Sequence, residues 1–226
     1  MKKIAVLTGA GISAESGIST FRDQNGLWEN HDIMEVASFD GWTKNPELVL
    51  DFYNQRRAQL AEVQPNLAHE LLVQLESFYQ VNIITQNVDD LHERAGSKHI
   101  IHLHGELRKA RCSRLDNHIA DIGYRPIQLG EKSPNGFQIR PHIVWFGEMV
   151  PELENAIPFF EEADIILVIG TSLNVYPAAG LIHYGRPETP IYVIDPDTDI
   201  QVNSSNVKHL SCSASEGMKQ IIEELT

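Results

Sequence analysis

Apolar residues gather in short runs that alternate with longer amphipathic segments. The first run, Lys3-Ile4-Ala5-Val6-Leu7-Thr8, is typical of a buried strand, and β-branched runs follow at residues 81–85, 99–103, 165–169, 191–194 and 207–210. Helical patterns lie between them at residues 46–60, 66–79, 89–95, 152–162, 177–184 and 215–225. Asn66 is expected to cap one helix and Gly96 to end another. This alternation predicts an α/β fold with a Rossmann-like, doubly wound, mostly parallel sheet.

Two stretches interrupt the alternation. Residues 25–63 form a long excursion between the first and second strands, and residues 106–141 are polar and turn-rich, with Ser133-Pro134-Asn135-Gly136 at their centre. We expect the second stretch to be irregular. Both are predicted to form a small module inserted beside the sheet, within a single domain of residues 1–226.

Charge and cysteine content restrict the class of protein. A net charge of -13 with a pI near 5.1 argues against nucleic acid and anionic membrane as partners, because both require a positive face. The two cysteines imply no disulfide framework, and no apolar run approaches roughly 20 residues. The first residues show no apolar core followed by a small-residue cleavage site, so we expect no secretion leader. We therefore expect a cytoplasmic protein. The sequence leaves the oligomeric state open, with a monomer as the expectation.

A glycine-rich turn follows the first strand and is expected to start a helix. It comprises Gly9, Ala10, Gly11, Ile12, Ser13, Ala14, Glu15, Ser16, Gly17 and Ile18. Glycines let the backbone approach a ligand closely, and a helix N-terminus attracts anions, so the turn predicts a pyrophosphate cradle. Close packing of strand and helix is the alternative.

Polar residues follow the other apolar runs, where the ends of parallel strands converge on one crevice. They are Gln86, Asn87, Val88 and Asp89; His104; Gly170, Thr171 and Ser172; and Asp195, Pro196 and Asp197. Taken singly, each residue also has a purely structural explanation. Asn87 or Asp89 could serve merely to cap a helix, and His104 could be a histidine that is hydrogen-bonded for stability alone. Together they offer a base that titrates near neutral pH and fixed groups that hold a ribose and a carboxamide.

Five segments stand in the order found in sirtuins, and the chain resembles that family from about residue 4 to 225. They are Gly9-Ala10-Gly11-Ile12-Ser13 with Gly17-Ile18 and Phe21-Arg22, then Thr85-Gln86-Asn87-Val88-Asp89, His102-Leu103-His104-Gly105, Val144-Trp145-Phe146-Gly147-Glu148 and Gly170-Thr171-Ser172. The resemblance implies an enzyme that consumes NAD and removes acyl groups from protein lysines, releasing nicotinamide and O-acyl-ADP-ribose. Its partners would be proteins that carry acyl-lysine.

The resemblance also implies a role for each matching residue. Residues 9–28 would wrap the pyrophosphate and the nicotinamide ribose, with Ala10, Phe21, Arg22 and Trp28 among them. Asn87 would orient the ribose and a water, and Asp89 would bind the carboxamide. Residues 170–172, Asp195 to Asp197 and Ala214 would contact the adenosine part, although relatives usually have asparagine where Asp195 stands. His104 would be the general base. His102 shares a strand face with it, so geometry alone leaves the choice open.

Two segments are predicted to bind the substrate. Val144, Trp145, Phe146 and Gly147 would pair with the substrate backbone as an added strand, with an ordinary edge strand as the alternative. Tyr53 and Arg56, three apart on a helix, would receive a carboxylate, so succinyl- and malonyl-lysine are expected substrates besides acetyl-lysine. Arg57 fits the helical spacing as well, but the resemblance favours Arg56. The alternative is a solvated helix face.

The zinc site of most sirtuins is missing from this sequence. Cys112 stands where a first ligand would be, Cys212 lies near the C-terminus, and a substitute from Cys112, His118 and His142 matches no usual spacing, so we predict no metal.

Other uses of the glycine turn stay open. An oxidoreductase should show an acidic residue at the end of a second strand, and Asp23 comes too early. Transfer of ADP-ribose to protein and a non-enzymatic nucleotide-binding module are the remaining alternatives.

Overall fold

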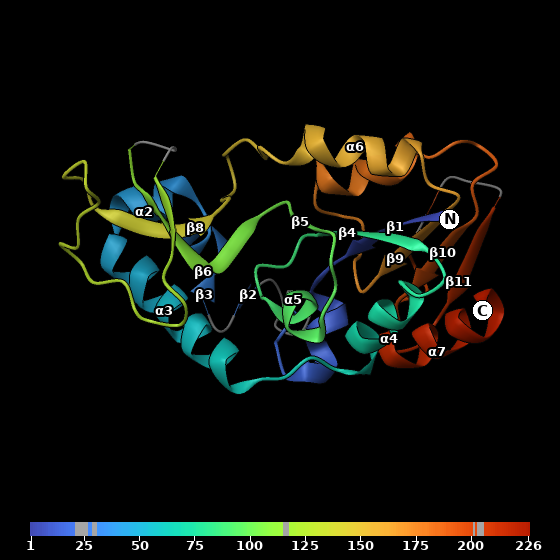
Figure 1. Cartoon of the computed structure of the whole chain (residues 1–226). Helices are drawn as coiled ribbons and strands as arrows, with labels where there is room; N and C mark the ends of the chain where they lie inside the picture. The colour runs from blue at the N-terminus through green and yellow to red at the C-terminus, as the bar shows by residue number, and fades with distance from the viewer. Residues whose placement is uncertain (21–26, 29–30, 115–117, 201, 203–205) are drawn as a thin grey trace.

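Six parallel strands form the main sheet of the computed structural model, which describes residues 1–20, 27–28, 31–114, 118–200, 202 and 206–226 (Figure 1). The strands lie in the order β11-β10-β9-β1-β4-β5. Their bounds are β1 Lys3–Thr8, β4 Gln80–Thr85, β5 Ile100–His102, β9 Ile165–Ile169, β10 Ile191–Ile194 and β11 Val207–Leu210. Every pair is parallel, which confirms the predicted Rossmann-like sheet.

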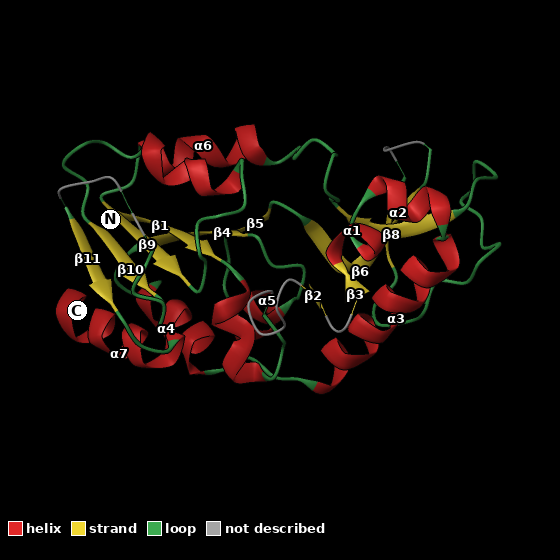
Figure 2. Cartoon of the chain, turned by 180° about the vertical axis from the view of Figure 1, so that it is seen from behind, coloured by secondary structure: helices red, strands yellow, loops and turns green. Residues whose placement is uncertain are grey.

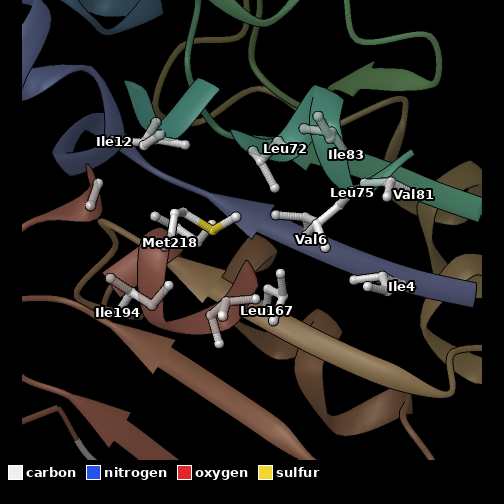
Figure 3. Close-up of a cluster of buried hydrophobic side chains, with 14 of the residues drawn as sticks. Ile4, Val6, Ile12, Leu72, Leu75, Val81, Ile83, Leu167, Ile194 and Met218 are labelled. Atoms are coloured by element: carbon white, nitrogen blue, oxygen red, sulfur yellow. The ribbon is translucent and has the colours of Figure 1, made fainter. Parts of the chain in front are cut away.

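Helices cover both faces of this sheet (Figure 1 and Figure 2). On one face lie η1 (Ala10–Ser16), α4 (Leu67–Leu75), α5 (Leu91–Ala95) and α7 (Ala214–Leu225), and on the other α6 (Leu153–Glu161) and η2 (Ala178–Tyr184). In the first layer, Val6 and Leu167 from the strands pack with Leu72 of α4 and Met218 of α7 (Figure 3). The second layer packs Phe160 and Leu181 against the opposite side chains of the same strands. Strands buried on both faces explain the continuous apolar runs.

A separate layer beside the sheet holds a second core. It contains α1 (Ile33–Val36), α2 (Phe39–Lys44), α3 (Pro46–Glu62), the short pair β2 (Leu27–Trp28) and β3 (His31–Asp32), and the antiparallel sheet of β6 (Gly105–Cys112), β7 (Ile119–Asp121) and β8 (Ile139–Ile143). Phe52, Tyr53, Leu107 and Trp145 are buried together in it. The expectation of an irregular stretch at 106–141 was therefore wrong. The charged residues of β6 hide the strand pattern, because Lys109 pairs with Glu106 of the same strand and Arg111 pairs with Glu148 beyond β8, so the strand has no alternating apolar face.

The helices lie close to where the sequence predicted them, but two of them are 3₁₀-helices rather than α-helices. Asn66 caps α4 by accepting from the Ala68 N–H, and Gly96 ends α5 in the left-handed conformation, as predicted. The segment after the glycine turn is a 3₁₀-helix rather than an α-helix, and so is η2. Within the described residues, no helix has the length and apolar character needed to cross a membrane. The carboxyl ends of the sheet strands point toward the second core (Figure 1).

Candidate functional site

Two glycine segments interlock at the carboxyl end of the sheet. The Gly9 N–H donates to the Ile169 carbonyl (3.0 Å) and the Gly11 N–H donates to the Gly170 carbonyl (2.9 Å). A Cβ on Gly170 would lie 2.3 Å from the Ile12 nitrogen, and the φ of Gly170 is +64°. Only glycine satisfies both constraints. The glycines thus let the turn after β1 pack directly against the loop after β9 at the carboxyl end of the sheet, where folds of this class bind phosphates.

The far end of the turn is anchored by polar side chains rather than left free for a ligand. The Asn66 amide donates to the Ile12 carbonyl (2.8 Å) and to Ser16 Oγ (3.0 Å). Glu15, predicted to contact the cofactor, accepts from the Ser215 N–H (2.9 Å) and joins η1 to the first turn of α7. Gly17 then ends η1 with a φ of +92°.

Behind the turn, three polar side chains form a buried group that the sequence predicted to converge. Ser13 Oγ donates to Asp89 Oδ2 (3.0 Å), and Asn87 Nδ2 donates to Ser13 Oγ (3.2 Å). Asp89 is 6 % exposed and Asn87 is 7 % exposed. Burial raises the pKa of Asp89 to about 6. The hydrogen bonds from Leu91 and Ser13 favour the charged form and lower the pKa, but burial has the larger effect. A carboxyl group held near its pKa in a crevice is typical of a functional site.

The hydrogen bonds of His104 and His102 distinguish these two candidate bases. Each Nδ1 lies 3.0 Å from a backbone carbonyl, of Gln86 for His104 and of Asn87 for His102, and a carbonyl can only accept. Each Nδ1 therefore carries a proton, and Nε2 is the atom free to act as a base. His102 Nε2 is engaged by Glu93 at 2.7 Å, whereas His104 Nε2 makes no hydrogen bond with any residue that the structure describes.

The pKa values of the two rings differ in the same sense. Burial lowers the pKa of His104, so the ring is a neutral base at neutral pH. Burial acts the same way on His102, but the hydrogen bond and charge of Glu93 outweigh it and raise the pKa of that ring. His104 is thus the better base of the two, a choice that the strand pattern had left open.

Beside His104 lies the segment predicted to bind substrate. The Val144 N–H donates to the His104 carbonyl and the Phe146 N–H to the Ala37 carbonyl, both at 2.9 Å. Trp145 is only 2 % exposed, while Phe146 is 45 % exposed. Of the two aromatic rings, Phe146 is the one that a substrate can reach, and Trp145 is part of the core.

Trp145 orients Tyr53 of α3. The indole Nε1–H donates to the Tyr53 hydroxyl oxygen (3.0 Å), and Trp28 of β2 lies edge-on to the same ring at 6.1 Å. Trp28, predicted to contact the cofactor, thus packs on the second core. Because the phenol oxygen accepts from Trp145, its own hydrogen remains to be donated to a ligand. Burial raises the pKa of Tyr53, so the phenol keeps that hydrogen.

The two neighbouring arginines of α3 have different environments. Arg57 is fully buried and donates from Nε to the Leu107 carbonyl (2.6 Å) and from Nη1 to Asn54 Oδ1 (2.8 Å), so it joins α3 to β6. Arg56 is half-buried, with its guanidinium 5.2 Å from the centre of the Phe52 ring. Arg57 is thus committed to the β6 backbone, whereas the Arg56 guanidinium lies over the Phe52 ring.

Glu148 was not predicted as a site residue, yet it anchors the Val144 segment. Its Oε2 accepts from the Trp145 N–H (2.9 Å), and its Oε1 pairs with Arg111 (2.9 Å) and with Arg140. The Arg140 guanidinium also lies 4.0 Å from the Trp145 ring centre. The two arginines that pair with Glu148 come from β6, 37 residues away, and from β8, eight residues away, so no local spacing could have revealed this cluster.

The remaining predicted residues lie in several parts of the structure. Gln86 and Thr171 are joined, since Gln86 Nε2 donates to Thr171 Oγ1 (3.0 Å). Asp195 is 3 % exposed and accepts from the Asp197 N–H (2.9 Å), so its carboxylate shapes the turn after β10. Ile18 and Val88 pack on the second core, Ala214 is buried at the start of α7, and Ser172 follows Thr171 in the loop after β9. Phe21 and Arg22 lie outside the described residues.

Potential metal ligands are dispersed. In the described ranges, three ligand atoms come within 4.8 Å only at Glu93, His102 and Glu106, and there Lys109 pairs with Glu106. Cys112 ends β6 and contacts Ser133 Oγ (3.4 Å), while Cys212 precedes α7 beside the main sheet. The thiols of this chain therefore do not combine into the four-cysteine site of zinc-bearing relatives.

Comparison with known proteins gives one family. Residues 9–177 match the Sir2 family. An NAD-dependent protein deacylase of Helicobacter pylori is 54% identical over 225 residues, which cover 100% of this chain and 98% of that protein. One of Bacteroides thetaiotaomicron is 52% identical over 227 residues, covering 98% and 97%. The fold is similar to that of a Sir2 homologue–NAD complex, with a TM-score of 0.89, 39% identity and coverage of 99% and 89%. A Sir2–p53 peptide–NAD+ structure has a TM-score of 0.77, 31% identity and coverage of 98% and 92%.

Proposed function

The chain belongs to the Sir2 family, and on that premise we propose that it is an NAD-dependent protein deacylase. Its proposed substrates are proteins that carry acyl-lysine. The observation that carries the proposal is the His104 Nε2, which has no partner among the described residues. His104 lies between β5 and β6, and its Nδ1 bonds to the Gln86 carbonyl of the segment that carries the buried Asn87 and Asp89. A base, an amide and a carboxyl group at one strand end suit a ribose and a carboxamide.

The residues at the strand ends fit NAD. Gly9, Gly11 and Gly170 let two backbone turns approach each other at the carboxyl end of the sheet, where dinucleotide pyrophosphates bind, and Asp89 is a buried hydrogen-bond acceptor. When bound, NAD supplies an ADP-ribose unit that accepts the acyl group as nicotinamide leaves. His104 would take a proton from a ribose hydroxyl at Nε2, and Asn87 would orient the ribose. Buried surroundings exclude the water that otherwise hydrolyses NAD.

Tyr53 and Arg56 are the proposed receptor for acidic acyl groups such as succinyl and malonyl. Support comes from the Trp145 hydrogen bond, which leaves the Tyr53 hydroxyl hydrogen available, and from the half-buried guanidinium three residues further along the helix. A guanidinium and a phenol bind a carboxylate through up to three hydrogen bonds. Acetyl-lysine lacks the carboxylate and is proposed as a further substrate that does not use the receptor.

The substrate backbone is proposed to run beside residues 144–147. Phe146 would cover the lysine methylenes, because it is the exposed aromatic residue of the segment. The Trp145 N–H is already bonded to Glu148, so pairing with substrate would use other backbone groups of the segment.

The second core is proposed to hold together without zinc. The Glu148 pair with Arg140 and the backbone bonds of Asn54 to Ile127 (3.0 and 2.9 Å) tie α3, β8 and the β7–β8 connection together. Elemental analysis should therefore find no stoichiometric zinc, and chelation should leave the melting temperature unchanged. A stoichiometric metal would contradict this part of the proposal.

One experiment tests the activity and separates it from the alternatives. The protein is incubated with NAD and succinyl-, malonyl- or acetyl-lysine peptides, and the products are identified by mass. A deacylase yields nicotinamide and O-acyl-ADP-ribose, an ADP-ribosyltransferase yields modified protein, and an oxidoreductase yields NADH. Tyr53→Phe with Arg56→Met should lower the succinyl and malonyl rates by about tenfold or more and spare acetyl, as the loss of one charged hydrogen bond implies. Lys44→Met, exposed on α2, is the control. Equal loss for all three peptides would refute the receptor.

A further inference from the structure

Three successive backbone carbonyls of the loop after β4 are hydrogen-bonded by donors from residues 102–107. The donor–acceptor pairs are His104 Nδ1 to the Gln86 carbonyl (3.0 Å), His102 Nδ1 to the Asn87 carbonyl (3.0 Å) and the Leu107 N–H to the Val88 carbonyl (2.8 Å). The segment that supplies the proposed base therefore also holds the loop that carries Asn87. A group that fixes this loop can influence the reaction without touching NAD.

His102 is the histidine of this segment that the proposed reaction does not use. Its side chain is 8 % exposed, and its second ring nitrogen, Nε2, lies 2.7 Å from Glu93 Oε1 of α5. The ring therefore links the Asn87 carbonyl to α5. Because both of its nitrogens are engaged, the ring is suited to holding these two groups rather than to taking a proton from a substrate.

Both partners of His102 are hydrogen-bond acceptors. A backbone carbonyl only accepts, and so does an ionised carboxylate. A neutral imidazole has one N–H and satisfies only one of them, so a ring bonded to both carries two hydrogens and a positive charge. Burial acts to raise the pKa of Glu93, but the hydrogen bond and charge of His102 outweigh burial and lower it, so Glu93 is the carboxylate that this pairing requires.

The other charged groups that face the ring are compatible with an imidazolium. Burial acts to lower the pKa of His102, and the negative charge of Glu106 of β6 joins Glu93 in outweighing it, while Lys109 pairs with Glu106. Burial dominates the pKa values of Asp89 and His92, and the charge of His102 acts to lower both. A charged His102 therefore favours the ionised form of Asp89, which is the stronger acceptor for a carboxamide.

We propose that His102 is a positioning residue that acts as an imidazolium, paired with Glu93, and that it fixes the Asn87 carbonyl and so sets the Asn87 amide for the ribose. A charged donor makes a stronger hydrogen bond than a neutral one, and it holds the backbone unit to which the amide side chain is attached. The Asn87 Nδ2 also donates to Ser13 Oγ (3.2 Å), so movement of this unit would displace the amide from its place beside the glycine turn. This rests on the proposed role of Asn87.

Two variants of His102 test the hydrogen bond to Asn87. His102→Leu removes both donors and should lower kcat for nicotinamide release about tenfold, the effect of one misaligned hydrogen bond, while KM for the acyl peptide stays within about twofold. His102→Asn keeps an N–H near the Nδ1 position and should recover the rate to within about threefold of wild type. His99→Leu, exposed just before β5, is the matched control. A full rate in His102→Leu would overturn the proposal.

Glu93→Gln tests the charge, and it keeps the test decisive if His102→Leu does not fold, because the Glu93 side chain is 40 % exposed. Without its counter-ion, His102 should lose its second proton at lower pH. The kcat of Glu93→Gln should therefore fall relative to wild type by about threefold or more as the pH rises from about 6.5 to 8. In the His102→Asn background the same substitution should cause no such fall, because the two residues act through one pair. Glu70→Gln, exposed on α4, is the control. An equal fall in both backgrounds, or no fall in either, contradicts the proposal.

The protonation state can be measured without enzymatic activity. Two-bond ¹⁵N–¹H spectra of the wild-type protein at about pH 7 should show hydrogens on both ring nitrogens of His102 and on Nδ1 alone of His104. A neutral His102 ring at that pH would overturn the proposal. A wild-type protein that releases no nicotinamide would refute the proposed function and leave the charge assignment of His102 standing.

Discussion

Replacing Asp89 with asparagine should make the free protein more stable at alkaline pH while impairing its function. The folded pKa is about 6 and the reference value is 3.8, a difference of about 2 pH units. At about 1.4 kcal/mol for each unit, the buried charge destabilises the fold by about 3 kcal/mol above pH 6. The substituted amide would carry no charge, but it would disturb the bond from Ser13 at a cost of about 1 kcal/mol. The net gain at pH 8 is about 2 kcal/mol.

The pH dependence identifies the cause of this gain. Between pH 3.8 and 6 the folded wild type holds one more proton than the unfolded chain, so its stability falls as pH rises through that window. Asp89→Asn lacks the titration, and its advantage should shrink by about 1.4 kcal/mol between pH 8 and pH 5.

Urea unfolding of wild type and Asp89→Asn at pH 8 and pH 5, without ligand, measures this difference. Asp40→Asn, whose carboxylate is exposed on α2, should differ from wild type by less than about 0.5 kcal/mol at both pH values. A variant that is less stable at pH 8, or an advantage that does not change with pH, would refute the reasoning. The same variant should release nicotinamide more slowly, because the amide is a weaker acceptor for the carboxamide. Stability gained with function lost is expected where a group is kept for binding.

Three other predictions concern the glycine cradle, the Glu148 cluster and the base. Gly170→Ala should lower the free energy of unfolding by about 3 kcal/mol or more, because the new Cβ would meet the Ile12 nitrogen. Gly123 has a similar φ, but a Cβ there would have nothing within 4 Å, so Gly123→Ala should lower the free energy of unfolding by only about 1 kcal/mol in the same urea titration. Glu148→Gln removes the charge that balances buried Arg140 and Arg111, and should lower the free energy of unfolding by about 3–5 kcal/mol. The loss should appear as a lower melting temperature and as faster proteolysis between residues 106 and 141. An unchanged melting temperature would contradict the stabilising role of these ion pairs. The pKa of His104 is lowered and that of Asp89 is about 6, so kcat/KM for deacylation should fall as pH drops below about 6.5 and reach its plateau by about pH 7. A value of kcat/KM that still rises between about pH 7.5 and 9 would exclude His104 as the base.

Local patterns identified most of the main sheet. The run Lys3–Thr8 is β1 residue for residue, and the Asn66 cap and the Gly96 stop lie where their chemistry predicted. Such signals act within a few residues, through side-chain period and backbone preference, so they survive without knowledge of the fold. The small antiparallel sheet was missed for the same reason. In β6, Arg111 is buried by an ion pair with Glu148, 37 residues away, and no local rule foresees that.

The same distinction between local and long-range information applies to the candidate site. The sequence by itself determined which residues meet at the strand ends, because parallel strands bring Asn87, His104 and Gly170 to one edge whatever surrounds them. Only the tertiary structure decided what each group does there. Glu93 bonds to His102 Nε2, while His104 Nε2 has no partner among the described residues, Glu15 of η1 bonds to the first turn of α7, and Trp145 is buried in the second core. Protonation state, tautomer and exposure depend on neighbours that are distant in the chain, and those neighbours are set by packing.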